Sequence, residues 1–408
     1  MLNQRGLIKP LFLPTPTPTR TANSFIMEGK DLFKAGDLER AITAYQKAVT
    51  RAPQSEILAE LARIQTYSSS LLSTDQQRFQ RLKEAKASIE QALELAPDDA
   101  STLAVHAFVL DWYASNSLVT EDDRQSFLNE AEAAAARSYN LDLNNALTLA
   151  YYAEILVDQQ KWSQAQKYIE QAAALDRDTT IMDVHRVYGY VWESVAQYNA
   201  AIKEYQKAAE INPNLTFLYI FIGRNYLSLE VHNRALEYFE KAVKINEQLG
   251  VKDPVPYIEI AKTYVRDGEF FIASLNAEKA LRFDPTNPNT YGQLGSIYSR
   301  ARNYETAKPT FKCAVRGCTA TENQTAQEVL GQGYDVPALP LTSITVAYYY
   351  VQYGSVLAAL SRPGQNYCSE ALAVLDEVRA TYSGDTVLMS IVEENEAICR
   401  MVGSTSQP

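Results

Sequence analysis

The sequence predicts an all-α protein that is built from stacked antiparallel helix pairs. The main observation is an alanine that recurs along most of the chain: three of its spacings are 34 residues, and the others are 2 to 12 residues longer. These alanines are Ala41, Ala85, Ala131, Ala165, Ala201, Ala235, Ala273 and Ala307. Small, aromatic and proline residues recur at similar offsets around them, as in Gly189, Trp192, Tyr205 and Pro213. A repeat of this length predicts an array of similar units instead of one globular core.

The residue types at these offsets explain how each unit would form. Small residues such as Gly29 and Ala41 allow two helices to approach closely, and the helical period of 3.6 residues places Ala41 and Tyr45 on one face. Tyr45, or its equivalent Phe239, would fill the space between one unit and the next. Pro53 would end the second helix, because proline cannot continue the hydrogen-bond ladder. Each pair leaves one face uncovered, so we expect a right-handed superhelical solenoid of about nine pairs with a C-terminal capping helix.

This pattern resembles the tetratricopeptide repeat, a 34-residue helix–turn–helix unit. The resemblance covers about 22–315 well and 342–402 loosely. It implies an array of about eight repeats over 22–316, in which the second and third repeats carry insertions near Ser68–Arg81 and Ala114–Arg124. These extra residues would form either longer helices or longer turns. We favour longer helices, because charged and apolar residues keep helical spacing there.

The ends of the chain depart from the repeat. Residues 1–21 are predicted to be an extended linker, because alternating proline and threonine favour polyproline II. Residues 317–341 are predicted to be an irregular loop, and 342–408 a divergent helix pair with a capping helix and a short tail. The Pro/Thr segment also resembles the tether of exported bacterial repeat proteins of this family. That resemblance implies a membrane anchor upstream of Met1, unless the chain has none.

All four cysteines lie in the last hundred residues and suggest two disulfides. Cys368 and Cys399 lie at equal distances from a predicted turn, so an antiparallel hairpin would bring them level. Gly317 is expected to end a helix in the left-handed conformation, which would bring Cys313 and Cys318 together. Two disulfides would indicate an oxidising, extracytoplasmic compartment. Four buried free thiols in a cytoplasmic protein are the alternative interpretation.

Composition and motifs argue against several classes of function. The 38 Lys and Arg residues against 49 Asp and Glu residues give a net charge of −11, which argues against nucleic-acid binding. The longest uncharged run, Val336–Ser361, contains two prolines and is too polar to span a membrane. Nucleotide-binding, metal-binding and nucleophile motifs are absent, and only three His residues are present. We therefore expect no enzymatic activity, no cofactor and no bound metal.

The resemblance also implies a function and a site. In this family the first helices of successive pairs line a concave groove that binds extended peptides or helices. The groove positions that we single out are Arg186, Tyr190, Phe217, Arg224, Lys262, Arg266 and Arg300. The last four would form a basic strip, and Tyr190 and Phe217 would be aromatic anchors. The corresponding positions of the fourth repeat are Glu154 and Asp158, so the groove changes sign along its length.

The sequence therefore predicts a non-catalytic scaffold that binds a protein or peptide, with an acidic segment as the favoured ligand. The alternative for the strip is a solvated surface whose cations pair with glutamates such as Glu193 and Glu259. The alternative function is self-association of the chain into a surface layer or filament.

Overall fold

The computed structural model describes residues 20–72, 74–362 and 364–404. These residues form 20 helices and no strand, which confirms the predicted all-α solenoid. Nine antiparallel pairs are followed by a single helix at the C-terminal end, with one short helix inserted before the last pair. The predicted Pro/Thr tract at 14–19 lies outside the described residues.

The helices of the first six pairs are α1 (Ala22–Lys34), α2 (Leu38–Arg51), α3 (Ser55–Ser69), α4 (Asp75–Leu95), α5 (Ala100–Ala114), α6 (Glu121–Leu141), α7 (Ala146–Asp158), α8 (Trp162–Leu175), α9 (Met182–Ser194), α10 (Tyr198–Ile211), α11 (Thr216–Ser228) and α12 (His232–Leu249). The remaining helices are α13 (Val255–Arg266), α14 (Phe270–Phe283), α15 (Pro288–Arg300), α16 (Tyr304–Arg316), α17 (Gln324–Leu330), α18 (Ile344–Leu360), α19 (Cys368–Tyr382) and α20 (Thr386–Ser404).

Glycines on first helices and aromatic rings on second helices hold several pairs together. A Cβ atom on Gly223 would lie 2.3 Å from the ring of Phe239, so only glycine leaves room for that ring. The same contact recurs at Gly29 with Tyr45, Gly189 with Tyr205, and Gly295 with Phe311. The sequence analysis placed these rings between successive units. Their closest contact at these glycines is instead within their own pair.

The extra residues of the second and third repeats lie mainly in longer helices. The second helices of these repeats, α4 and α6, each have 21 residues, whereas α2 and α8 have 14. A capping box formed by Thr74 and Gln77 stabilises the start of α4. Three acidic residues occupy the first turn of α6, where their negative charge interacts favourably with the helix dipole.

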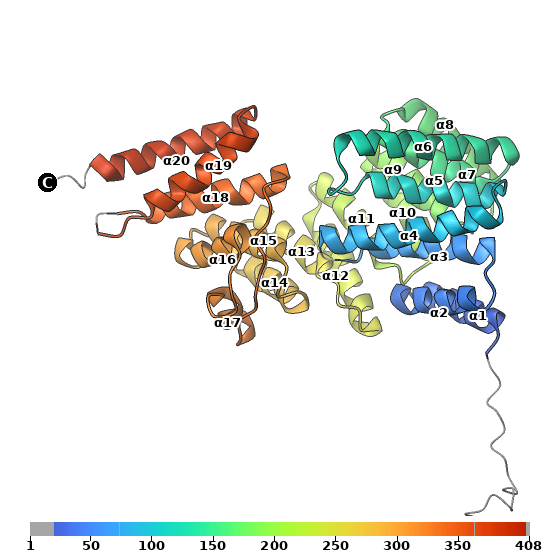
Figure 1. The fold of residues 1–408 in the computed structure, drawn as a ribbon, viewed down its shortest axis with the longest axis horizontal. Helices are drawn as coiled ribbons and strands as arrows, with labels where there is room; N and C mark the ends of the chain where they lie inside the picture. The colour runs from blue at the N-terminus through green and yellow to red at the C-terminus, as the bar shows by residue number, and fades with distance from the viewer. Residues whose placement is uncertain (1–19, 73, 363, 405–408) are drawn as a thin grey trace, which may run out of the picture.

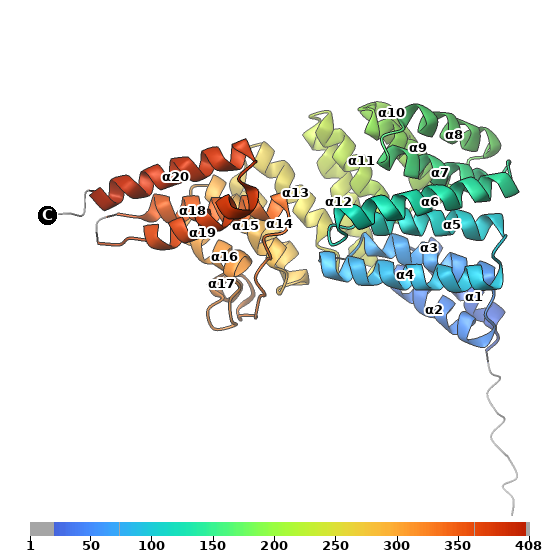
Figure 2. The same ribbon diagram turned by 45° about the horizontal axis from the view of Figure 1, so that its top comes forward.

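The solenoid consists of two lobes along its long axis (Figure 1). We call α1–α12 the first lobe and α13–α20 the second lobe, so α13 is the helix at which the two lobes meet. One hydrophobic cluster extends through the first lobe to Ile260 on α13, and a second cluster begins at the next residue, Ala261. Adjacent faces of α13 therefore belong to different cores, and Tyr264 packs against both. The two lobes are also separate when the molecule is turned (Figure 2).

The first lobe closes on itself. Helix α3 of the second repeat contacts α9 and α11 of the fifth and sixth repeats: Arg63 forms an ion pair with Asp183 at 2.9 Å, and the ring of Tyr67 stacks on Phe217 at 5.3 Å between centroids. Within the first pair, the turn at Gly36 between α1 and α2 abuts the backbone of Asn214. The concave side of this lobe is therefore filled by its own side chains over much of its length.

The segment 317–341, which was expected to be irregular, contains the short helix α17. Gly317 has a φ of 72° and a ψ of 166°, so it does not form the left-handed turn that the sequence suggested. The chain instead leaves α16 in an extended direction, and Cys318 forms an isolated antiparallel bridge with Val336. The disulfide between Cys313 and Cys318 forms all the same.

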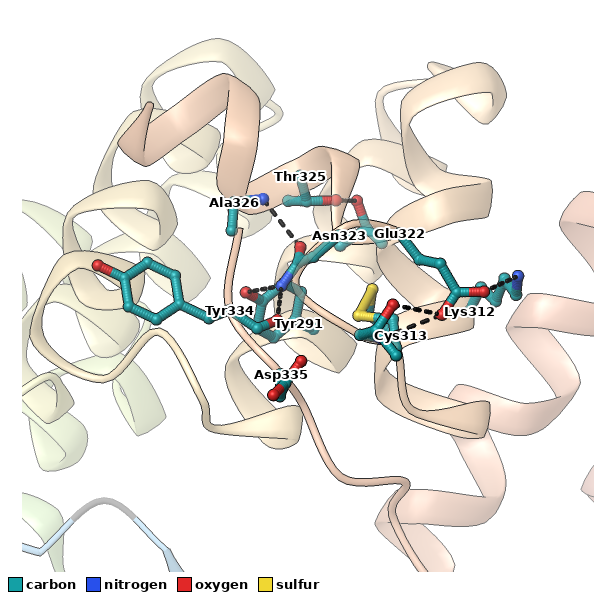
Figure 3. Close-up of a disulfide and its surroundings, with 12 residues drawn as sticks. Tyr291, Lys312, Cys313, Glu322, Asn323, Thr325, Ala326, Tyr334 and Asp335 are labelled. Carbon is teal, nitrogen blue, oxygen red and sulfur yellow. Dashed lines mark hydrogen bonds and ion pairs between the residues drawn. A yellow bond between two sulfur atoms is a disulfide. The ribbon is translucent and has the colours of Figure 1, made fainter. Parts of the chain in front are cut away.

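Buried polar contacts hold this segment against α15 and α16 (Figure 3). Nδ2 of Asn323 donates hydrogen bonds to the hydroxyl of Tyr291 and to the carbonyl oxygen of Tyr334, both at 2.8 Å. The hydroxyls of Thr310 on α16 and Thr325 on α17 also form a hydrogen bond, with 2.9 Å between their oxygens. The loop is therefore part of the packed second lobe.

The second predicted disulfide, between Cys368 and Cys399, joins the start of α19 to α20. Helix α20 buries Leu388 and Val392, and Nδ2 of Asn395 donates a hydrogen bond to the hydroxyl of Ser355 on α18 at 2.8 Å. It therefore covers the last pair, as a capping helix must, because an open end of a solenoid would expose apolar surface.

Candidate functional site

The predicted groove positions divide into buried and exposed residues. Arg186 and Phe217 are each 3% exposed, so both belong to the interior of the first lobe. Tyr190 is half-buried, and its hydroxyl donates a hydrogen bond to Asp158 on α7. The four cations of the basic strip are exposed and lie on the first helices α11, α13 and α15. They are Arg224, Lys262, Arg266 and Arg300.

Arg186 is the centre of a buried ion pair. Its two terminal nitrogens donate to both carboxylate oxygens of Glu154 on α7, at 2.7 and 2.5 Å, and its Nε donates to the hydroxyl of Tyr67 at 3.1 Å. The rings of Tyr67 and Trp112 lie 5.4 and 5.8 Å from its guanidinium. A bidentate ion pair enclosed by aromatic rings holds the guanidinium in one orientation. Arg186 therefore stabilises the lobe from within.

Asp183, one turn before Arg186 on α9, joins three helices. It accepts hydrogen bonds from the hydroxyls of Tyr67 on α3 and Tyr151 on α7, and it pairs with Arg63. Burial acts to raise the pKa of Asp183, but the nearby charges of Arg63 and Arg186 hold this pKa below its ordinary value. The carboxylate is thus ionised and fully engaged at neutral pH. This network closes the concave side where the sequence analysis expected an open groove.

The basic strip lies where the first lobe ends. Glu259 on α13 has a side chain that is 6% exposed, and it pairs with Arg224 at 3.0 Å and with Lys262 at 3.2 Å. Burial acts to raise the pKa of Glu259, but these two cations lower it below its usual value. Within the part of the chain that the structure describes, the exposed side chains of Arg266 and Arg300 form no hydrogen bond or ion pair. The strip thus carries more positive charge than its own glutamate balances.

A pocket of about 410 Å³ opens on the concave side of the first lobe, next to Arg224. Acidic and aromatic side chains from α5, α7, α9, α10 and α11 make up half of its lining residues. They are Asp111, Trp112, Glu154, Asp158, Tyr190, Glu193, Tyr205 and Phe221. Of the seven residues that the sequence analysis singled out as ligand-binding positions, Arg186, Tyr190 and Arg224 border this pocket, together with Glu154 and Asp158, the groove positions of the fourth repeat.

Sequence reasoning missed Asp111, Tyr67 and Asp183. A signal for Asp111 was present, because it is the one charged residue in the apolar run from Leu103 to Tyr113. A buried carboxyl in such a run requires a polar partner. Tyr67 and Asp183 are 116 residues apart, so no local pattern could have paired them.

None of the described helices has the length and the apolar character that crossing a membrane would require. No group of three or more His, Cys, Asp or Glu side chains in the described part of the chain is arranged to hold a metal ion.

A stack of helix pairs with a cleft on its concave side defines a helical-repeat protein. Family models of the tetratricopeptide repeat match residues 26–65, 77–99, 189–215, 218–249 and 276–308. In these segments the chain matches the tetratricopeptide repeat, as the sequence pattern predicts, and together they cover less than half of the chain.

The chain is also similar to known repeat proteins. Over 126 residues it is 27% identical to anaphase-promoting complex subunit 3 of Schizosaccharomyces pombe, a match that covers 31% of this chain and 18% of that relative. Two solved structures share the fold. The human IFIT1 dimer with PPP-AAAA has a TM-score of 0.55 at 16% identity, covering 95% of this chain and 92% of that one. The Cut9–Hcn1 hetero-tetramer of the anaphase-promoting complex has a TM-score of 0.51 at 15% identity, covering 93% and 78%.

Proposed function

We propose that this protein is a non-catalytic scaffold that binds an acidic segment of a partner protein along the basic strip. The observation that carries the proposal is the pair of exposed, unpartnered guanidinium groups of Arg266 and Arg300 on neighbouring first helices. Guanidinium groups bind carboxylates in a bidentate manner, and cations on a regular scaffold can pair with successive acidic side chains. The repeat family supports this function, because such proteins bind other proteins, and a relative is named as a subunit of a complex.

The buried position of Phe217 changes the details of this proposal. Phe217 stacks on Tyr67 and cannot serve as an anchor for a ligand without opening the first lobe. The ligand would therefore lie across α13 and α15, beyond the closed part of the concave side. Arg224 and Lys262 would also attract the ligand, because the single negative charge of Glu259 balances only one of their two positive charges.

Charge reversal tests the strip. The double variant Arg266→Glu and Arg300→Glu should bind a fluorescein-labelled glutamate-rich peptide at least tenfold more weakly than the unchanged protein in fluorescence anisotropy, because two charge-assisted contacts become repulsive. Arg282→Glu, an exposed arginine on the second helix α14, is the matched control and should bind normally. Equal binding by all three proteins, or preference for a lysine-rich peptide, would refute the proposal.

Self-association is a second candidate, and one observation favours it. Phe271 is 75% exposed at the start of α14, and Ile272 and Leu275 on the same helix are also exposed. Exposed apolar groups of this kind favour contact with another protein surface. If they join copies of this chain, light scattering should show a mass that rises with concentration, and Phe271→Ser should abolish the rise. A constant monomer mass would exclude this candidate.

We also infer that the protein folds in an oxidising compartment, as the sequence analysis expected. The support is that all four cysteines are paired in the structure. Alkylation of the protein after denaturation, without a reductant, should label no thiol in material isolated from its native source. Four labelled thiols would favour the cytoplasm. The membrane anchor and the bacterial tether remain predictions from the resemblance.

A further inference from the structure

The pocket on the concave side of the first lobe has carboxyl groups that form no ion pair with any cation among the described residues. Asp158 accepts hydrogen bonds from Tyr190 and Ser115, and Glu193 accepts them from Tyr205 and Asn225, but neither forms an ion pair within the described residues. The hydroxyls and amide that hold these carboxylates are neutral. Their negative charge therefore remains in the pocket.

Asp111 at the base of the pocket is the least satisfied group. Its side chain is 1% exposed, and its Oδ1 is buried without a hydrogen-bond donor. A buried polar atom without a partner costs about 1–3 kcal/mol, so such an atom calls for an explanation. An atom that lines a cavity can regain a partner when a ligand carrying a donor enters it.

The arginines of the pocket are already engaged. Arg186 is held by Glu154, and Arg224 by Glu259. Arg78, at the mouth, pairs with Asp75 and donates to the carbonyl oxygen of Leu72. None of the three forms an ion pair with Asp111, Asp158 or Glu193.

The rest of the lining favours an organic cation over a metal ion. The rings of Tyr190, Tyr205 and Phe221 face the pocket, and the described residues contain no metal-ligating cluster. Aromatic rings attract ammonium and guanidinium groups through their negative faces. The protein already shows this arrangement once, because the Arg186 guanidinium lies among aromatic rings with a carboxylate as its partner.

We propose that this pocket is a binding site for an organic cation, an alkylammonium or guanidinium group whose N–H groups donate to Asp111 and Asp158. The site is separate from the basic strip and has the opposite charge preference. Its volume of about 410 Å³ lies in the range of small-molecule pockets. The cation can come from a free diamine or from a lysine or arginine side chain of a partner.

The protonation of the two aspartates is consistent with an unfilled cation site. Burial, together with the carboxyls of Asp158 and Glu154, raises the pKa of Asp111 well above its usual range. Burial also raises the pKa of Asp158. The two carboxyls are also hydrogen-bonded to each other, which favours a proton on one of them, whereas a bound cation would favour the ionised form of both.

Titration calorimetry with cadaverine and agmatine tests the proposal on the full chain. The unchanged protein should bind at least one of them, and it should not bind 1,5-pentanediol, which has the length of cadaverine without its charge. Asp111→Asn and Asp158→Asn keep the side-chain shape and should each weaken binding at least tenfold. Asp122→Asn, an exposed aspartate on α6, is the control and should bind normally.

A second arm identifies the source of the cation. A blocked Gly-Arg-Gly or Gly-Lys-Gly peptide that binds more tightly than the free diamines, and that loses affinity in Asp158→Asn, would assign the pocket to a partner side chain. Tighter binding of the free diamines would assign it to a small molecule. Absence of binding by every cation, or binding that neither aspartate variant changes, would overturn the proposal. If Asp111→Asn fails to fold, Asp158→Asn carries the same test.

Discussion

The two lobes contain the same kind of helix pair but use their concave sides differently. In the first lobe, α3 reaches across to α9 and α11, and ion pairs and stacked rings fill the space between them. In the second lobe, a loop and two disulfides reinforce the stack, and exposed arginines remain on its first helices. The comparison teaches that a repeat specifies how a pair packs, whereas the residues on the concave face decide whether the superhelix closes.

One repeat position illustrates this difference. Tyr190, Arg224 and Lys262 each follow the small residue of a first helix by one position, after Gly189, Gly223 and Ala261. Tyr190 is half-buried against Asp158, whereas Arg224 and Lys262 have side chains that are 46% and 51% exposed. Arg224 still borders the pocket that Tyr190 lines, whereas Lys262 does not. Equivalent positions therefore change from a half-buried tyrosine to exposed cations where the first lobe ends.

The largest expected effect comes from breaking the network that closes the first lobe. Asp183→Asn removes one of the two carboxylates that pair with Arg63 and leaves this guanidinium with Glu60 as its remaining partner. Loss of one partner of a buried ion pair typically costs about 3–5 kcal/mol, and the remaining pair with Glu60 should keep the loss at the lower end of that range. We expect a lower free energy of unfolding in denaturant, with faster amide exchange confined to α3, α7 and α9.

The matched control for this variant is Asp178→Asn, at an exposed position in the loop before α9. It should leave both measurements unchanged. If Asp183→Asn also leaves amide exchange in α3 unchanged, the contact between the second and fifth repeats does not close the lobe.

The disulfide between Cys368 and Cys399 should have the corresponding role in the second lobe. It encloses 31 residues, and in the chain-entropy account removing it costs about 3–4 kcal/mol at most. The double variant Cys368→Ala and Cys399→Ala should speed amide exchange in α19 and α20 and leave the first lobe unaffected. Faster exchange in α3 or α9 would show that the two lobes unfold together.

The contrast between the lobes also explains what sequence analysis could and could not predict. The alanine spacing predicted eight of the nine pairs, because each unit contains its own packing contacts within a few tens of residues. The ninth pair and the capping helix were predicted from the divergent C-terminal segment, because an open end of a solenoid would expose apolar surface. The closure of the first lobe depends on the rotation between successive repeats, added up over several of them. The sequence does not reveal these rotations, so it could not show that Tyr67 meets Phe217. Phe217 was therefore assigned to an open groove.

The cysteines and the acidic pocket differ in the same way. The two disulfides were predictable because each pair lies on neighbouring elements whose register follows from a turn. The predicted left-handed turn at Gly317 was nevertheless wrong. The chain runs extended there because Cys318 forms a bridge with Val336, a residue of the returning loop that no local pattern places. The pocket required Asp111, Asp158 and Glu193 from three different repeats, and only the sign change at Glu154 and Asp158 hinted at it.

The pH dependence of the free energy of unfolding tests the junction between the lobes, where Asp253 lies in the loop from α12 to α13. Burial raises the pKa of Asp253 to about 6, although Val255 and Asn246 donate hydrogen bonds to it. An unfolded aspartate has a pKa of about 3.9. Between these values the unfolded chain releases its proton before the folded protein does, so this group lowers stability as the pH rises from about 4 to about 6, by about 3 kcal/mol at most.

Asp253→Asn has no carboxyl to titrate, and its amide oxygen can still accept from Val255. Its free energy of unfolding should therefore fall less than that of the unchanged protein between pH 4 and pH 6. Asp122→Asn, at an exposed site, should follow the unchanged protein. A parallel fall in all three proteins would show that Asp253 ionises normally and that the junction is open to water.

The smallest expected effect tests what the lobes have in common. Gly223→Ala in the first lobe and Gly295→Ala in the second would place a Cβ atom 2.3 Å and 2.8 Å from the rings of Phe239 and Phe311. Alanine favours the helix by up to about 1 kcal/mol, but overpacking against a rigid ring costs about 1–3 kcal/mol, so each variant should be less stable by about 1–2 kcal/mol. Gly384→Ala, where a Cβ meets nothing within 4 Å, should not destabilise the protein. Similar losses of stability in both variants would show that the two lobes differ only on their concave faces. A loss in one variant only would show that the packing within the pairs differs as well.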